Sequence, residues 1–121
     1  MLIWLPIMIY GTTVALGLAL GWYFLSEKRP PRALQALHLI LGFGGLEAVM
    51  LTTTKVGGSP DLKQNATIAL VLLGITAVVG LFAGIMAKSH PANMGTILAA
   101  HGLAGGTAFL VLANWAMNAA G

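Results

Sequence analysis

Residues 65–87 read NATIALVLLGITAVVGLFAGIMA, and no side chain in this stretch carries a charge. A helix of this length extends about 34 Å, which is enough to cross the roughly 30 Å hydrocarbon core of a bilayer. Three more apolar segments of similar length lie on either side of it, at about 2–25, 33–54 and 95–119. The sequence therefore predicts four transmembrane helices.

The composition agrees with a membrane protein along the whole chain. Of its 121 residues, 58% are hydrophobic and 7% are charged, whereas soluble domains carry about 25% charged residues. The chain has no cysteine, which excludes disulfides, thiolate metal sites, iron–sulfur clusters and c-type haem attachment. The first segment has no basic region before it, so we expect a membrane span there and not a removable signal peptide.

Short polar breaks at residues 26–32, 55–64 and 88–93 separate the segments. Short connections make consecutive helices antiparallel neighbours. We therefore predict an all-α, up-down-up-down four-helix membrane bundle that forms a single domain over residues 1–121. Aromatic residues near the helix ends are expected at the membrane interfaces. They are Trp4, Trp22, Tyr23 and Trp115.

The basic residues predict an orientation. The first and third breaks carry four of them, Lys28, Arg29, Arg32 and Lys88, and the second carries Lys55 and Lys63. Because cytoplasmic loops carry an excess of Lys and Arg, the first and third breaks are expected in the cytoplasm. Both termini would then lie outside, in a multi-pass protein of a bacterial inner membrane.

An internal repeat appears when the sequence is shifted by 63 residues without a gap. Nine residues between positions 11 and 42 then coincide with their counterparts between 74 and 105, including glycines of the odd helices and a histidine of each even helix. The most informative matches are Gly17 with Gly80, Gly21 with Gly84, and His38 with His101. We expect two tandem two-helix repeats, about 1–58 and 64–121, related by an axis along the membrane normal.

The matched histidines are the first candidate site. His38 and His101 lie five and six residues into their helices, roughly 8 Å below the same surface. Ionisable residues inside a membrane are costly and mark function by default. Imidazole is a ligand of haem iron, and helix bundles build cofactor sites from side chains on facing helices. The pair is predicted to be the metal-ligand set of one haem b, with a polar helix contact as the alternative.

Seven glycines are expected to make room for the porphyrin around this pair. At about 100° per residue, Gly42 and Gly45 lie on the same side of their helix as His38. The full set is Gly17, Gly21, Gly42, Gly45, Gly80, Gly84 and Gly105. The alternative for the glycines of the odd helices is plain small-residue helix packing.

Three basic residues on the same side as the histidines, Arg29, Arg32 and Lys88, are candidates for neutralising the haem propionates. The alternative is that these residues serve only the positive-inside signal. Glu47 is the one carboxylate within a predicted span. It lies nine residues from His38, about 180° around the helix, and should face away from the haem.

In this arrangement of histidines and glycines the sequence resembles the membrane-bound four-helix cytochromes b, in particular the haem-bearing bundle of the quinol-oxidising cytochrome b. In that family the ligand histidines come from the second and fourth helices and glycines from the first and third. The family also has a second histidine about fourteen residues further along each ligand helix. Here those positions hold Thr52 and Trp115, so the resemblance implies one haem and not two.

The resulting hypothesis is an electron-transfer subunit without catalytic residues of its own, which exchanges electrons with a quinone or a partner redox protein. Two alternatives stay open. One is a chlorophyll- or bacteriochlorophyll-binding, or purely structural, accessory subunit, with one pigment per histidine. The other is a small multidrug transporter, for which Glu47 would have to replace the carboxylate that such exporters carry in their first helix. Nucleic acid is not an expected partner.

Overall fold

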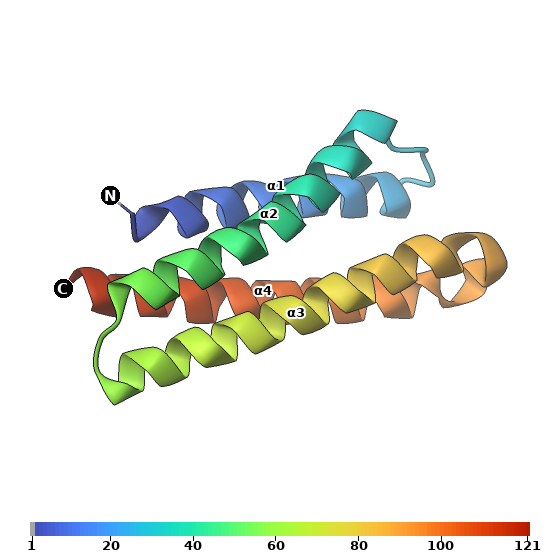
Figure 1. Cartoon of the computed structure of the whole chain (residues 1–121). Coiled ribbons are helices and arrows are strands. Elements are labelled where there is room, and N and C mark those ends of the chain that lie inside the picture. Colours follow the sequence, from blue (N-terminus) through green and yellow to red (C-terminus); the bar gives the residue numbers. More distant parts are fainter. Residues whose placement is uncertain (1) are drawn as a thin grey trace.

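The computed structural model describes residues 2–121, which form four α-helices and no β-strand. Helix α1 spans Trp4–Leu25, α2 Arg32–Val56, α3 Pro60–Ser89 and α4 Met94–Ala120, and a short 3-10 turn, η1 Pro91–Asn93, precedes α4. Consecutive helices run in opposite directions, and both ends of the chain lie at one end of the bundle (Figure 1). We call this the terminal end, and the opposite end, with the basic connections at 26–31 and around 90, the basic end.

Helix α3 begins five residues before the expected start at residue 65. The Ser59 hydroxyl caps it by accepting a hydrogen bond from the backbone N–H of Leu62 at 3.4 Å, and Pro60 suits the first helical turn. The connection to α2 shrinks to three residues, within which Gly57 and Gly58 have φ of 66° and 117°. Only glycine adopts such angles readily, so the tight reversal depends on this pair.

The outer surface of the bundle is apolar. Each of the four helices in residues 2–121 is long and apolar enough to cross a membrane. Many large hydrophobic side chains point outward, among them Leu18 (71% exposed), Leu25 (78%) and Leu103 (74%). Soluble monomers rarely expose apolar surface on this scale. These features fit a lipid environment and indicate a multi-pass membrane protein.

The four helices form two hairpins. Helix α1 packs along α2 and α3 along α4, and the hairpins meet through the less extensive α1–α4 and α2–α3 contacts. This order places α2 and α4, the two helices that carry the internal histidines, diagonally across the bundle.

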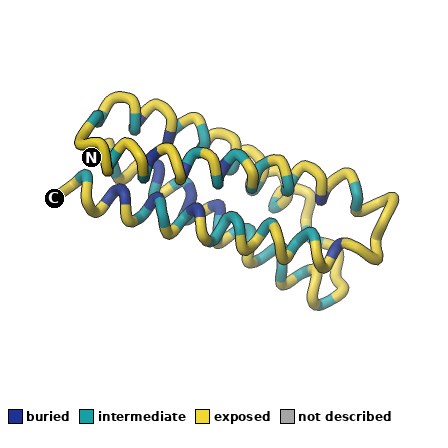
Figure 2. Tube along the Cα trace, turned by 90° about the horizontal axis from the view of Figure 1, so that it is seen from below, coloured by how far each residue is buried: buried dark blue, intermediate teal, exposed yellow. Residues whose placement is uncertain are grey.

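The packed core occupies only one half of the molecule, towards the terminal end (Figure 2). Its largest members include Tyr10, Val49, Leu112 and Trp115. The interfacial position expected for Trp115 is wrong: this side chain is 1% exposed. Its place near a helix end was predicted correctly, but it lies on the face of α4 that points into the bundle.

The half towards the basic end is packed much less tightly. Over residues 14–44 and 77–107, only Ala83 and Met94 are buried. His38 and His101 both belong to this half and are half-buried. The fold therefore combines a dense half that holds the hairpins together with an open half that contains the histidines.

Candidate functional site

The structure brings His38 of α2 and His101 of α4 together. Their ring centres lie 5.9 Å apart, and the ring planes are inclined at 77°. The two residues are 63 positions apart in the sequence, so only the diagonal placement of α2 and α4 makes them neighbours.

A backbone hydrogen bond fixes the orientation of each ring. His38 Nδ1 lies 2.9 Å from the carbonyl oxygen of Thr13, and His101 Nδ1 lies 3.0 Å from that of Thr76. A carbonyl oxygen can only accept, so Nδ1 is the donor and carries the proton in both rings. The lone pair of the neutral imidazole is then on Nε2, the state in which histidine ligates metals.

The two Nε2 atoms remain open to a ligand. The hydrogen bonds of both rings within residues 2–121 involve Nδ1. In the same part of the chain, every fully buried side-chain nitrogen or oxygen has a hydrogen-bond partner. The unpaired Nε2 atoms are therefore not sealed inside the core.

Two glycines give the rings access to these carbonyls. In an α-helix the carbonyl of residue 13 bonds to the N–H of residue 17, so the side chain at position 17 stands beside that carbonyl. A Cβ at Gly17 would lie 3.0 Å from His38 Cε1, and one at Gly80 would lie 2.8 Å from His101 Cε1. The imidazole rings thus occupy the space that side chains at positions 17 and 80 would fill.

The other predicted glycines fall into two groups. Gly42, Gly45 and Gly105 lie at helix contacts, where added Cβ atoms would meet Thr13, Tyr10 and Thr76 side chains at 3.9, 3.0 and 3.1 Å, respectively. Tyr10 also donates its hydroxyl to the Gly42 carbonyl at 3.0 Å. At Gly21 and Gly84, by contrast, a Cβ would meet nothing within 4 Å, which leaves open space near the histidines.

The contacts around the two histidines recur at the 63-residue offset. Thr13 and Thr76 supply the carbonyls, Gly17 and Gly80 the space for the rings, and Gly42 and Gly105 the contacts with the threonine methyl groups. Sequence reasoning missed the role of the two threonine carbonyls. The available signal was the match of Thr13 with Thr76 in the repeat alignment.

The spacing of the rings suits a single metal between them. One metal ion bonded to a nitrogen of each imidazole, at about 2.0–2.1 Å per bond, would hold the ring centres roughly 6 Å apart. No group of three or more His, Cys, Asp or Glu side chains in residues 2–121 is arranged to hold a metal. The two imidazoles are the groups at this site that could ligate a metal, and a metal held by them alone would need further ligands from elsewhere.

The positions of a second haem in the resembling family are closed in this fold. Thr52 is 2% exposed and Trp115 is 1% exposed, and both lie in the packed half. A plate-like cofactor at that depth would have to displace the core. The expectation of a single haem stays a prediction.

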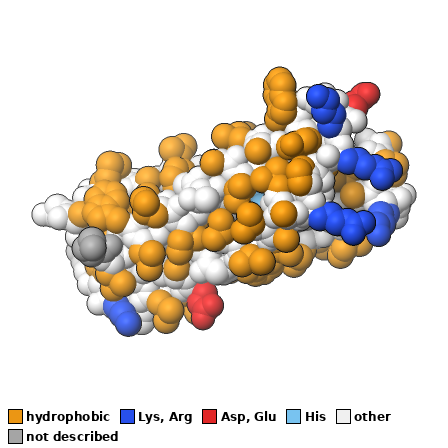
Figure 3. Space-filling view, turned by 90° about the horizontal axis from the view of Figure 1, so that it is seen from above, with side chains coloured by type: hydrophobic (Ala, Val, Ile, Leu, Met, Phe, Trp, Pro, Cys, Tyr) orange, Lys and Arg blue, Asp and Glu red, His pale blue; other side chains and the backbone are white. Residues whose placement is uncertain are grey.

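The charged candidates lie at the rim of the open half. Lys and Arg side chains gather at the basic end of the molecule (Figure 3), and Arg29, Arg32 and Lys88 are all exposed. Arg32 is six residues, or about 9 Å along the helix, from His38. The predicted propionate partners thus lie towards the same end of the bundle as the histidines.

Glu47 lies exposed on α2, as its half-turn offset from His38 predicts.

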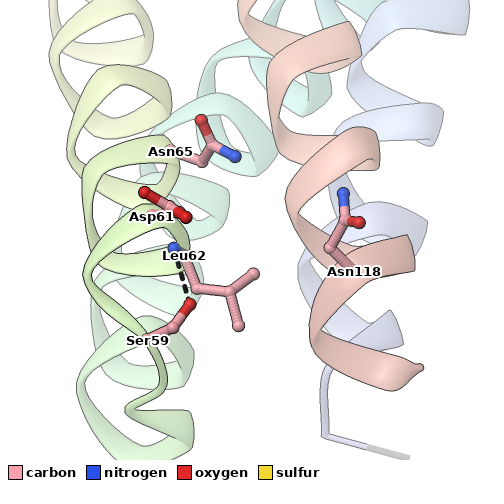
Figure 4. A pocket seen from close by; sticks show the side chains of 5 residues that line it. All are labelled: Ser59, Asp61, Leu62, Asn65 and Asn118. Atoms are coloured by element: carbon pink, nitrogen blue, oxygen red, sulfur yellow. Dashed lines mark hydrogen bonds between the residues drawn. The ribbon is translucent and has the colours of Figure 1, made fainter.

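Two surface pockets are found at the terminal end, away from the histidines. One, of about 340 Å³, lies between the start of α3 and the end of α4 and is lined by Ser59, Asp61, Leu62, Asn65 and Asn118 (Figure 4). The other, of about 530 Å³, is lined by Leu2, Trp4, Leu5 and Met8. Neither pocket carries a histidine.

No protein-family model matches the chain, and no curated protein or solved structure is significantly similar to it. The likeness to cytochromes b accordingly rests on the positions of the histidines and glycines. The case for a function depends on the geometry of the histidine pair.

Proposed function

We propose that this chain is a membrane-embedded b-type cytochrome that holds one haem between His38 and His101 and transfers electrons as a subunit of a larger redox complex. The observation that carries the proposal is the histidine pair, with ring centres 5.9 Å apart and both Nδ1 atoms bonded to backbone carbonyls. The recurrence of this arrangement at the 63-residue offset supports a two-fold related pair of axial ligands.

The residues of the chain have distinct parts in this function. The Thr13 and Thr76 carbonyls set the tautomer and the rotation of the rings, so that Nε2 of each histidine is the ligand atom. Arg29, Arg32 and Lys88 would pair with propionates near the basic end. A haem held by His38 and His101 would supply one-electron redox chemistry. Electron transfer at such a centre requires no acid or base from the protein.

The geometry favours this proposal over the two alternatives. A pair of stacked pigments, each ligated by one histidine, would push the ring centres well beyond the roughly 6 Å that a single shared metal requires. The observed 5.9 Å therefore supports one shared metal over such a stacked pair. A transporter would need its carboxylate in the interior, whereas Glu47 faces outward.

The test is a reduced-minus-oxidised optical spectrum of the protein purified in detergent, together with His38→Ala and His101→Ala. The native protein should show sharp low-spin haem bands. Either substitution removes one axial ligand, so we expect loss of haem or conversion to a high-spin spectrum.

The chain provides its own control in His90, which is exposed in the connection before α4 and whose side chain forms a hydrogen bond with the Ser89 hydroxyl. His90→Ala should keep the native spectrum. A native protein without haem bands, or low-spin bands that persist in both His38→Ala and His101→Ala, would contradict the proposal. A chlorophyll-like spectrum would favour pigment binding instead.

A further inference from the structure

The outward face of α2 carries a charge among apolar side chains. Ile40 (65% exposed), Gly44, Glu47 and Leu51 (56% exposed) are all exposed. They follow one another at intervals of four, three and four residues, and therefore form one stripe along the helix. This is also the spacing with which two helices pack side by side.

Glu47 lies deep within the apolar part of this helix. It is about 22 Å from Arg32 at the start of α2 and about 13 Å from Val56 at its end, at 1.5 Å per residue. Carboxylates within a membrane span almost always face the bundle interior or pair with another group, because an ionised side chain in hydrocarbon is costly. Glu47 faces outward, where only another molecule can supply that pair.

The carboxylate is not required by the scaffold. The residue 63 positions later, on the matching face of α4, is Leu110, which is 69% exposed. Likewise Gly44 corresponds to Thr107. The outer faces of α2 and α4 thus differ at two adjacent points: α2 alone combines a carboxylate with a glycine one turn away.

This combination suits another helix. At Gly44 an added Cβ would meet nothing within 4 Å, so a neighbouring backbone can approach closely there. A cation on that neighbour would neutralise Glu47 in a medium of low dielectric constant, where charge pairs attract strongly. We infer that the α2 face formed by Ile40, Gly44, Glu47 and Leu51 binds a membrane-spanning helix of a partner protein that carries a lysine or arginine at the depth of Glu47.

The inference rests on the proposed membrane placement and does not depend on haem. It can be tested in phosphatidylcholine vesicles that contain the full-length chain, labelled with a donor fluorophore. The probe is a synthetic leucine-rich spanning helix with one central arginine, labelled with an acceptor; the matched probe has leucine in place of the arginine. The arginine probe should bind on the order of ten-fold more tightly than the leucine probe, and Glu47→Leu should abolish the difference.

A second variant tests whether the whole face matters. Glu47→Leu combined with Leu110→Glu moves the carboxylate to α4, beside Thr107 instead of a glycine, and should bind the arginine probe more weakly than the native chain. Equal binding by this variant would overturn the inference, because any exposed carboxylate would then suffice.

Two further outcomes would also overturn it. One is equal binding of both probes by the native chain. The other is energy transfer between two differently labelled copies of the chain that disappears in Glu47→Leu, because the face would then serve self-association. Insertion of each variant is checked by resistance to alkaline extraction. A native chain that fails to insert would contradict the membrane placement, and its haem spectrum would report separately on the histidine pair.

Discussion

The arrangement of the two histidines depends on the lack of a side chain at Gly17 and at Gly80. Each ring reaches a threonine carbonyl because the residue four positions later is glycine, and an added Cβ would approach the ring to 3.0 Å at Gly17 and 2.8 Å at Gly80. Real Cβ atoms are not found at the shorter of these distances, so a methyl group at position 80 has to displace the ring. Displacing the ring would also distort the hydrogen bond from His101 Nδ1 to the Thr76 carbonyl, which sets the direction of Nε2.

Gly80→Ala should therefore weaken haem binding. Forcing a methylene-sized group into a filled space costs about 1–3 kcal/mol, which corresponds to a roughly 5- to 150-fold loss of affinity. The measurement is a haem titration of the apoprotein followed by absorbance.

Gly74→Ala is the matched control, six residues earlier in α3 and outside the set of glycines around the histidines, where an added Cβ meets nothing within 4 Å. Alanine favours helix by about 1 kcal/mol over glycine, so this variant should bind haem as the native protein does and unfold at the same or a higher temperature. Equal loss of haem in both alanine variants would show that the ring contact is not the cause.

At the scale of the helices, stability is concentrated in the half near the terminal end. The hairpins are joined there by a cluster around Trp115 and Leu112 of α4, Val49 of α2 and Leu73 of α3. Some residues of this cluster correspond to each other at the 63-residue offset. Val49 corresponds to Leu112, and Tyr10 corresponds to Leu73. The open half near the basic end is thus held in place by the far ends of its own helices.

Trp115→Ala should destabilise the fold by about 3–5 kcal/mol, the usual cost of deleting a buried aromatic side chain. Thermal unfolding in detergent, followed by circular dichroism, measures the effect. Trp22→Ala is the control: Trp22 also lies near a helix end but is 70% exposed, so its removal should change the unfolding temperature little. Similar losses for both variants would contradict the position of the core.

At the scale of the whole molecule, the charges distinguish the two ends. Lys28, Arg29, Arg32 and Lys88 lie at the basic end, which is also the end nearer the histidines. If this end faces the cytoplasm, as the positive-inside rule predicts, the haem lies close to the cytoplasmic surface and its electron partner approaches from that side.

Labelling of single cysteines can test this orientation, because the chain has no cysteine of its own. Ser89→Cys at the basic end and Ser59→Cys at the terminal end are both exposed positions. In right-side-out vesicles a membrane-impermeant maleimide should label position 59 directly and position 89 only after permeabilisation. The reverse pattern would place the basic end outside and overturn the predicted orientation.

Much of this architecture could be predicted from residue order. Four apolar stretches with short polar breaks leave an antiparallel bundle as the simple solution, and counting residues from the breaks placed His38 and His101 at the same depth. Such counting works because hydropathy and helical rise determine position along a helix axis. Folding in three dimensions decided how the faces of different helices meet: Trp115 turned into the core, and the threonine carbonyls met the imidazoles. These helices are apolar on nearly all sides, so periodicity carries little information about which face lies inside. Only packing between helices distinguishes the faces.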